Sequence, residues 1–310
     1  MISPAGIQTL QTAFQLAADV PMSQYTRFKV GGPADLLALP RTRQELQSLL
    51  TAAREASVPV TVVGGGCNLL VSDRGIRGLV VVTTRLKSGI RSEPQADNRT
   101  HLHMAAGEGL STVCQYALTH GLSGLEFCAG IPGTVGGAVM MNAGTASQGI
   151  GQAVHCLKAL DLKTLAAASL KKQDLNFSYR RLDLSNHLIL EITLELVPGD
   201  PDQIRQAYES NLRQKHRTQP MALPSAGCFF KNPRPDMPAG KLIQEAGLKG
   251  KTIRGARVSE IHANYIVNCG HATCRDILAL KSHIQEQILD RYGIFLETEV
   301  QITGDGIKNE

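Results

Sequence analysis

The sequence predicts an α+β protein, because helical and strand patterns are mixed along the chain without the strict β-α-β alternation of a doubly wound fold. A strand is clearest at residues 190–196, where Leu and Ile alternate with Glu and Thr as in a half-buried strand. A helix is clearest after Thr42, which forms a capping box with Glu45 ahead of apolar residues at helical spacing.

Shorter patterns predict the other elements and a domain boundary. The stretch Pro198-Gly-Asp-Pro201 has the composition of a linker, so we place the main boundary near residue 200. The other predicted elements are strands at 60–63 and 79–82, a helix at 111–120, a helix from Asp200 to about Lys215, a helix around 242–246, a strand near 265–268, a helix from Thr273 to Gly293, and a last strand at 294–302.

The charge of the chain is mildly positive. Lys plus Arg number 32 and Asp plus Glu number 27, which gives a net charge of +5. The basic residues form no long run and only 4% of residues are aromatic, whereas nucleic-acid binders typically combine a dense basic stripe with aromatic residues. We therefore expect small anionic ligands and no nucleic acid.

Composition also predicts a cytoplasmic protein without a membrane partner. The longest run without charged residues, Phe127–Leu157, contains too many glycines for a lipid-facing helix. The N-terminal segment lacks the cationic and apolar regions of a signal peptide. The seven cysteines are odd in number and show no C-x-x-C spacing, which favours reduced thiols over a disulfide framework or a zinc site.

Two glycine clusters predict a site for a phosphate-bearing cofactor. Gly64-Gly-Gly-Cys-Asn68 directly follows a predicted strand, and Gly130-Ile-Pro-Gly-Thr-Val-Gly-Gly137 is the second cluster. Backbone amides of glycines approach an anion without obstruction by side chains. A single cluster is more typical of a tight turn, but two of this density favour one extended cofactor. Neither matches the Rossmann or the P-loop pattern, so both of those sites are disfavoured.

These clusters are part of a longer series of sequence blocks in a fixed order over about residues 20–305. The blocks are Tyr25–Ala34, Gly64–Ser72, Gly124–Gly144, Tyr179-Arg180, Leu223–Pro233, Ala239–Gly247, Val258–Asn264 and Glu297–Val300. Together they resemble the UDP-N-acetylenolpyruvoylglucosamine reductase (UDP-N-acetylmuramate dehydrogenase) family. The uninterrupted C-terminal part is similar to the shorter subtype of that family.

The resemblance implies a fold and an activity. The fold is a vanillyl-alcohol-oxidase-type FAD-binding domain of two α+β subdomains at 28–199, after an N-terminal helical segment at 1–27 and before a smaller α+β substrate-binding domain at 200–305. The implied activity is NADPH-dependent reduction of UDP-N-acetylglucosamine enolpyruvate to UDP-N-acetylmuramate through non-covalent FAD. That reaction is an oxidoreduction at a CH–CH group in peptidoglycan precursor synthesis, which serves cell-wall biogenesis, cell shape and cell division.

The resemblance also implies which residues bind the cofactor. In such proteins the first glycine loop holds the FAD pyrophosphate and the second lies along the flavin. The residues carried over are Gly64, Gly65, Gly66, Asn68 and Leu69 in the first loop, and Gly130, Ile131, Gly133, Thr134, Gly136, Gly137 and Asn142 in the second.

Three residues are implied as catalytic. Hydride addition to the vinyl group creates negative charge that spreads into the substrate carboxylate, and the neighbouring carbon then needs a proton. Arg180 offers a guanidinium fork to that carboxylate. Cys228, where the family commonly has serine, is implied as the proton donor. Glu297 and Glu299 share one strand face, so periodicity cannot choose between them; the family's E-x-E-V pattern selects Glu299, to polarise the carboxylate or to position water.

The remaining candidates bind substrate or fall outside the site. Tyr179, Lys231 and Asn232 are the predicted substrate-binding residues, the last two at the UDP diphosphate, with Arg217, Gln219 and Lys241 as weaker candidates. No metal site is predicted, because His101, His103 and His262 lack ligand-like spacing along the chain. The sequence predicts no oligomeric state.

Two alternative functions remain open. One is a flavin oxidase on the same fold; many of these attach FAD covalently, and Cys67 and Cys128 are the candidates near the loops. The other is a non-catalytic nucleotide-sugar sensor, which the presence of Arg180, Cys228 and Glu299 disfavours.

Overall fold

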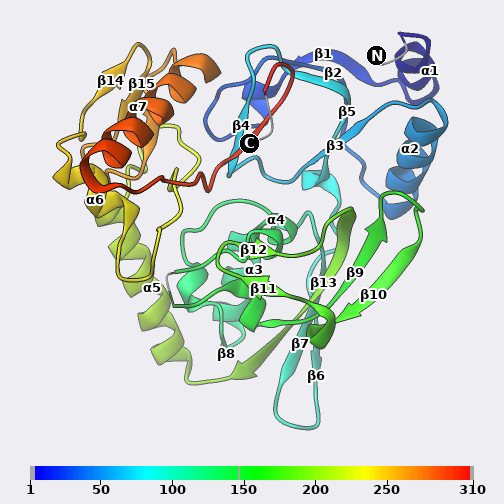
Figure 1. Cartoon of the computed structure of the whole chain (residues 1–310). Coiled ribbons are helices and arrows are strands. Elements are labelled where there is room, and N and C mark those ends of the chain that lie inside the picture. Colours follow the sequence, from blue (N-terminus) through cyan, green and yellow to red (C-terminus); the bar gives the residue numbers. More distant parts are fainter. Residues whose placement is uncertain (1–3, 146, 308–310) are drawn as a thin grey trace. The chain divides into compact units, whose positions relative to one another are not determined.

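The computed structural model describes residues 4–145 and 147–307, which form two compact units built from interleaved segments of the chain (Figure 1). The first unit comprises residues 1–15, 38–65 and 81–215, and the second comprises residues 16–37, 66–80 and 216–310. The predicted domain bounds, 28–199 and 200–305, follow the linear order of the chain and stay a prediction.

The first unit is organised around an antiparallel sheet in the order β10-β9-β13-β7-β6, with β8 also paired to β13. Its strands are β3 (Val60–Val63), β6 (Arg91–Pro94), β7 (Thr100–Ala105), β8 (Leu122–Ser123), β9 (Val154–Asp161), β10 (Ala167–Lys171), β11 (Phe177–Ser178), β12 (Arg181–Leu182) and β13 (His187–Pro198). Its helices are α1 (Pro4–Phe14), α2 (Arg43–Glu55), α3 (Leu110–Thr119), α4 (Val135–Met140) and most of α5 (Pro201–Thr218).

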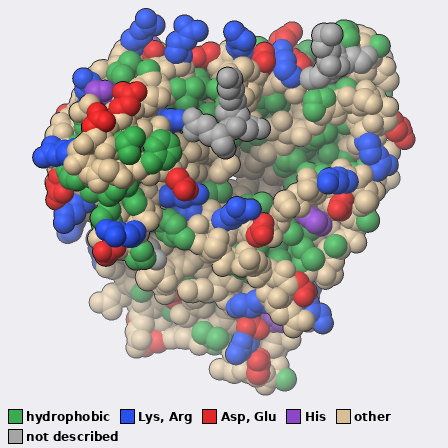
Figure 2. Space-filling view, viewed as in Figure 1, with side chains coloured by type: hydrophobic (Ala, Val, Ile, Leu, Met, Phe, Trp, Pro, Cys, Tyr) green, Lys and Arg blue, Asp and Glu red, His purple; other side chains and the backbone are tan. Residues whose placement is uncertain are grey.

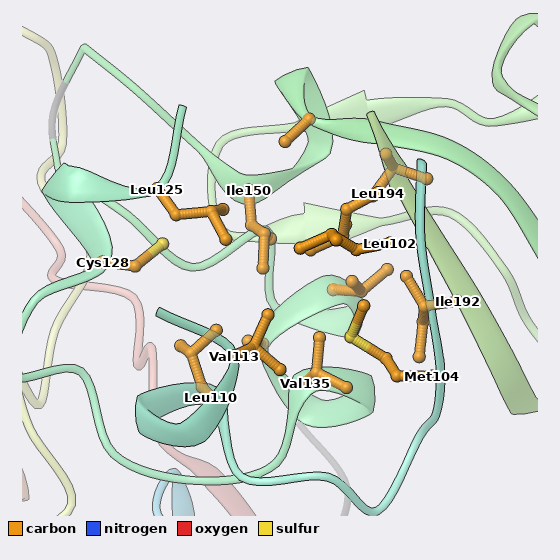
Figure 3. Close-up of a cluster of buried hydrophobic side chains, with 14 of the residues drawn as sticks. Leu102, Met104, Leu110, Val113, Leu125, Cys128, Val135, Ile150, Ile192 and Leu194 are labelled. Atoms are coloured by element: carbon orange, nitrogen blue, oxygen red, sulfur yellow. The ribbon is translucent and has the colours of Figure 1, made fainter. Parts of the chain in front are cut away.

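The core of this unit lies between the sheet and the helices α3 and α4. Leu194 and Ile192 point inward from β13, Leu102 and Met104 from β7, and Val135 from α4 (Figure 3). Thr193 and Glu195 occupy the opposite face of β13, as the predicted alternation requires. Burying one apolar face of the sheet under the helices stabilises the frame that carries both glycine clusters.

The second unit combines strands from the N-terminal part of the chain with the C-terminal helices and strands. Strands β1 (Ala17–Pro21), β2 (Pro33–Ala38) and β5 (Ile76–Val82) are neighbours in one sheet. The remaining elements are β4 (Leu69–Val71), α6 (Ala239–Glu245), β14 (Thr252–Ile253), β15 (Ala256–Val258), β16 (Ile266–Asn268), α7 (Cys274–Tyr292) and β17 (Gln301–Thr303). A second core centres on Phe229, Phe230 and the inner face of α7.

The predicted helix ends are confirmed by their capping contacts. Thr273 and Asp276 form a full capping box at the start of α7, and Gly293 ends that helix in the left-handed conformation. Asp200 accepts hydrogen bonds from the amides of Asp202 (2.9 Å) and Gln203 (3.3 Å) at the start of α5. Short polar side chains therefore mark these boundaries in the sequence.

The predicted last strand at 294–302 is wrong in its length, because only Gln301–Thr303 forms a strand, β17. The preceding segment changes partner along its length. The amide of Glu299 donates to the carbonyl of Phe229 (2.8 Å), whereas that of Gln301 donates to the carbonyl of Asn68 (3.0 Å). Because no single neighbouring segment pairs with all of residues 294–302, these residues do not form one continuous strand.

No helix within residues 4–145 and 147–307 has an apolar stretch long enough to cross a membrane. On the face drawn in Figure 2, Lys and Arg side chains alternate with Asp and Glu, and no single basic stripe is visible.

Candidate active site

The two glycine clusters meet in the first unit at Gly64 and Thr134. A Cβ atom added to Gly64 would lie 2.8 Å from Thr134 Oγ1, closer than ordinary contact allows. The same hydroxyl accepts a hydrogen bond from the amide of Gly137 (3.2 Å). Thr134 therefore leaves no room for a side chain on Gly64, and the two loops approach each other closely through glycine backbone. Glycine loops of this kind can bring backbone amides close to a pyrophosphate-bearing group.

Other glycines in the clusters are required by the fold itself. A Cβ on Gly136 would lie 2.8 Å from the Cβ of Ala106, and Gly66 has φ +61° with the carbonyl oxygen of Tyr25 in the place that a Cβ would take. These two glycines allow close approach of protein backbone. Gly64, Gly66 and Gly136 therefore all lie where close packing leaves no room for a Cβ atom.

Arg180 lines a pocket of about 570 Å³ in the first unit, together with Asn142 and Tyr179. Its Nη1 donates to the carbonyl of Thr145 (3.4 Å), and its guanidinium carbon lies 5.0 Å from the ring centroid of Tyr179. Asn142 donates through Nδ2 to the carbonyl of Ser178 (2.9 Å), so it links the second glycine cluster to the segment that carries Arg180.

Arg180 and Asn142 share an unusual backbone conformation, which affects the direction of their side chains. Arg180 has φ +58° and Asn142 has φ +41°, a region that non-glycine residues seldom occupy. Holding two such residues costs about 1–3 kcal/mol each, and strain of this kind is concentrated at functional sites. Eight other described non-glycine residues also have positive φ, so this conformation alone does not mark Arg180 as functional.

Lys215, on α5, is a further charged residue near Arg180 that the sequence did not single out as a site residue. It donates to the carbonyls of Phe127 (3.1 Å) and Ala129 (2.5 Å). Burial lowers the pKa of Lys215, the nearby thiols of Cys128 and Cys114 act in the opposite direction, and the charge of Arg180 lowers it further. The hydrogen bonds of Lys215 therefore connect α5 to the segment that precedes the second glycine cluster.

Cys228 belongs to a cluster in the second unit that also contains Tyr265, Glu299 and Arg27. Cys228 is half-buried and follows Gly227, whose φ is +85°. Burial raises the pKa of Tyr265 well above its usual range, and the hydrogen-bonded thiol of Cys228 and the charge of Glu299 raise it further, against the opposing effect of Arg27. The phenol of Tyr265 thus keeps its proton beside Cys228.

Glu297 and Glu299 have different surroundings, which the alternation of the sequence did not distinguish. Glu297 is exposed and pairs with Lys231, with 3.2 Å between Nζ and Oε2. Glu299 is half-buried, and its charge acts on Tyr265. The backbone of Glu299 is fixed by Asn68, which donates through Nδ2 to its carbonyl (2.9 Å).

Lys231 and Asn232, predicted at the substrate diphosphate, both have contacts within the second unit. The amide of Lys231 donates to the carbonyl of Glu297 (2.9 Å), in addition to the ion pair of its side chain. Asn232 Oδ1 accepts from the amide of Ala239 (3.0 Å) at the start of α6. Asn232 is thereby engaged in holding α6.

The segment that carries Cys228 is held by Asn264. Its Oδ1 accepts from the amide of Phe230 (3.0 Å), and its Nδ2 donates to the carbonyl of the same residue (2.8 Å). His262 Nδ1 in turn accepts from the amide of Asn264 (3.2 Å). Both residues therefore have structural contacts.

The structure thus groups the predicted site residues within two units. Arg180, Tyr179 and Asn142 share a pocket in the first, and Cys228 and Glu299 share a cluster in the second. Lys215, Arg27 and Tyr265 were not predicted as site residues. Arg27 lies inside the Tyr25–Ala34 block and Tyr265 directly follows the Val258–Asn264 block, so the blocks themselves were the available signal.

Comparison with known proteins gives consistent results for both parts of the chain. Residues 34–169 match the FAD binding domain family, and residues 219–303 match the family described as UDP-N-acetylenolpyruvoylglucosamine reductase, C-terminal domain. The crystal structure of UDP-N-acetylenolpyruvylglucosamine reductase from Thermus caldophilus is similar, with a TM-score of 0.77 and 33% identity, over 93% of this chain and 99% of that one.

Two curated relatives are named UDP-N-acetylenolpyruvoylglucosamine reductase. The protein from Desulfosudis oleivorans is 43% identical, over 96% of this chain and 98% of its own length. The one from Moorella thermoacetica is 42% identical, over 96% of this chain and 97% of its own.

The FAD-binding domain and the relatives named as reductases define an FAD-dependent oxidoreductase. The α+β prediction is confirmed, with an FAD-binding domain of the vanillyl-alcohol-oxidase type followed by a smaller C-terminal domain. The chain belongs to the UDP-N-acetylenolpyruvoylglucosamine reductase family.

Proposed function

We propose that this protein reduces UDP-N-acetylglucosamine enolpyruvate to UDP-N-acetylmuramate with NADPH as the electron donor, in the cytoplasm, as a step of peptidoglycan precursor synthesis that serves cell-wall biogenesis, cell shape and division. Membership of the reductase family supports the substrate class. The observation that carries the proposal is the Cys228–Tyr265–Glu299 cluster, in which Cys228 and Glu299 both act on the phenol of Tyr265, because reduction of a vinyl ether requires a nearby proton donor besides hydride.

A bound flavin would supply the hydride, and the residues of the chain would bind the substrate, stabilise the developing charge and supply the proton. Arg180 holds the substrate carboxylate with its guanidinium fork and stabilises the negative charge that reaches it during reduction. Its positive φ and its contact with Thr145 set the direction of the side chain before substrate arrives. We propose that Tyr179, in the same pocket, contacts the substrate.

In the second unit we propose that the thiol of Cys228 gives its proton to the carbon next to the carboxylate. Tyr265 donates or accepts a hydrogen bond at that sulfur and keeps its own proton. Glu299 positions a water molecule or, when it carries a proton, donates a hydrogen bond that polarises the substrate carboxylate. We propose that Lys231 binds the diphosphate, in exchange for its ion pair with Glu297, and that Asn232 shapes the same loop.

For the cofactor we propose contacts by Gly64, Gly65, Gly66, Asn68 and Leu69 in the first loop, and by Gly130, Ile131, Gly133, Thr134, Gly136, Gly137 and Asn142 in the second. We further propose an N-terminal segment at 1–27, a cofactor domain at 28–199 and a substrate domain at 200–305. The tight meeting of the loops at Gly64 and Thr134 supports a flavin held by backbone contacts.

We propose that the flavin is not covalently attached. Burial raises the pKa of the Cys67 thiol despite the opposing effect of Arg27, and a hydrogen bond with Cys114 together with burial raises that of Cys128. Both thiols therefore stay protonated and are poor nucleophiles. Acid precipitation should release all flavin into the supernatant; flavin that remains on the denatured chain would contradict this.

The experiment that tests the function follows NADPH consumption by the purified holoenzyme. Oxidation of NADPH should be slow alone and should accelerate when the enolpyruvyl UDP-sugar is added, with one UDP-N-acetylmuramate formed for each NADPH oxidised. Flavin that is reduced by a sugar and reoxidised rapidly by oxygen would instead favour an oxidase.

A further inference from the structure

A cluster of two histidines and a glutamate lies on the sheet of the first unit, apart from every residue assigned to the flavin reaction. Its members are His101 on β7, Glu195 on β13 and His155 on β9, which are neighbouring strands (Figure 1). Glu195 Oε2 lies 3.3 Å from His101 Nε2 and 3.4 Å from His155 Nδ1. One oxygen therefore faces a nitrogen from each adjacent strand.

The register of the sheet produces this arrangement. Glu195 and His101 are direct cross-strand partners on the face opposite the hydrophobic core. His155 reaches the same face through an irregularity in β9, because Thr193 pairs with Cys156 and Leu194 already pairs with Val154. His155 is thus the extra residue of a β-bulge, and a bulge re-aims a side chain. Without it, strict alternation would send His155 toward the core.

The spacing of the three groups matches a tetrahedral metal site. Zinc bonds of about 2.0–2.1 Å to histidine nitrogen and about 2.0–2.2 Å to carboxylate oxygen place neighbouring ligand atoms about 3.3–3.5 Å apart. The distances from Glu195 Oε2, 3.3 Å to His101 Nε2 and 3.4 Å to His155 Nδ1, agree with that edge, and without an ion the same distances allow hydrogen bonds. All three ligand atoms lie within 4.8 Å of one another. Small rotations of the side chains would complete the set.

The surroundings fix Glu195 and leave the cluster open to solvent. Arg99 pairs with the other oxygen, Oε1, so Oε2 is the one that faces the two imidazoles. The side chains of His101 and His155 are 14% and 45% exposed, so an ion can enter from solvent and keep a water molecule as fourth ligand. The neighbouring His103 is engaged differently, with Nδ1 3.1 Å from Thr193 Oγ1.

We propose that His101, His155 and Glu195 form a binding site for Zn²⁺ or a closely related divalent transition-metal ion. The ion joins three adjacent strands and stabilises the folded enzyme, as any ligand that binds only the native state does. The proposal runs against the sequence prediction of no metal site. That prediction considered spacing along the chain, whereas these ligands are brought together by strand register and by a bulge.

The test is calorimetric titration of Zn²⁺ into metal-stripped, flavin-loaded enzyme, with a matched set of variants. Glu195→Gln and His155→Ala should each weaken binding by more than about tenfold, since even outer partners of metal ligands contribute about 10–100-fold. The controls are His103→Ala, on the same strand and face, and Cys156→Ser, next to the bulge; both should bind as the parent does. Equal binding by the parent and His155→Ala, or equal loss in His103→Ala, would overturn the proposal.

A second readout separates ligation from loss of folding. Co²⁺ in place of Zn²⁺ should give visible absorption typical of a tetrahedral site in the parent, and none in His155→Ala that retains its flavin and its circular dichroism. Saturating Zn²⁺ should raise the thermal midpoint of the parent but not of that variant. A shift of equal size in both would show that zinc acts elsewhere, for example at the thiols.

Discussion

The two units assemble their proposed site residues by different means. In the first, backbone conformation does most of the positioning: Arg180 and Asn142 sit at positive φ, and the glycine clusters meet where a single added Cβ would clash. In the second, side chains position one another: Asn264 holds Phe230, and Tyr265 interacts with Cys228 and Glu299. The first should therefore respond to changes in shape and the second to changes in individual functional groups.

The largest expected effect is from Arg180→Ala. This variant should bind FAD and accept electrons from NADPH normally, but should transfer them to substrate about 10²–10³-fold more slowly, because removal of one charge-stabilising donor has that effect. Stopped-flow absorbance separates the two half-reactions. The matched control is Arg181→Ala, at an exposed position that pairs with Asp183. Collapse of flavin reduction itself would show that Arg180 has another role.

Gly64→Ala tests whether the first unit depends on shape. The new methyl group would press on Thr134 Oγ1, and overpacking costs about 1–3 kcal/mol. FAD affinity should therefore fall by about tenfold, which corresponds to about 1.4 kcal/mol. Gly199→Ala is the control, because Gly199 lies outside both glycine clusters, is not among the positive-φ glycines, and an added Cβ would meet only side-chain atoms, the nearest at 3.3 Å on Ile204. Flavin fluorescence titration of the stripped protein measures both; unchanged affinity in Gly64→Ala would remove the loop from the cofactor site.

Asn264→Ala tests the side-chain scaffold of the second unit. It leaves the buried amide and carbonyl of Phe230 without their partners, and each such group costs about 1–3 kcal/mol. We expect a loss of about 3 kcal/mol in the free energy of unfolding in urea. Asn211→Ala, which removes one half-buried hydrogen bond to the carbonyl of Glu126, should cost about 1 kcal/mol. Equal losses of unfolding free energy in the two variants would mean that the Asn264 hydrogen bonds contribute no more than a half-buried one.

The smallest expected effect concerns His262. Burial, with a contribution from Lys249, lowers its pKa in the folded protein. As pH falls below about 6.5, the unfolded chain takes up the proton first, so stability declines on acidification. We measure the free energy of unfolding in urea between pH 7.5 and 5.5. It should fall with pH in the parent and fall less steeply in His262→Gln. An identical slope in both proteins would contradict the assignment.

The sequence predicted features that depend on neighbours along the chain. The capping box at Thr273 and Asp276 and the end of α7 at Gly293 were visible because their partners are within a turn. Features that depend on distant segments were not visible. The strand at 294–302 was overpredicted because its alternation is real but its hydrogen-bond partners change between Phe229 and Asn68. Arg27, Tyr265 and the bulge at His155 likewise depend on contacts between distant segments.

The choice between Glu297 and Glu299 shows the same limit. Alternation put both residues on one face, and only the folded chain separates the exposed partner of Lys231 from the half-buried neighbour of Tyr265. Periodicity reports which side a residue faces, not what lies there.

Single-turnover reduction by Cys228→Ala and Cys228→Ser tests the central claim, that the side-chain cluster of the second unit supplies the proton. Each variant is reduced with NADPH and then mixed with the enolpyruvyl UDP-sugar, and UDP-N-acetylmuramate is quantified over time. The account predicts normal flavin reduction in both, substantial product from the serine variant because a hydroxyl can serve the same step, and stalled product formation in the alanine variant. Near-normal product formation by Cys228→Ala would mean that this thiol only fills space.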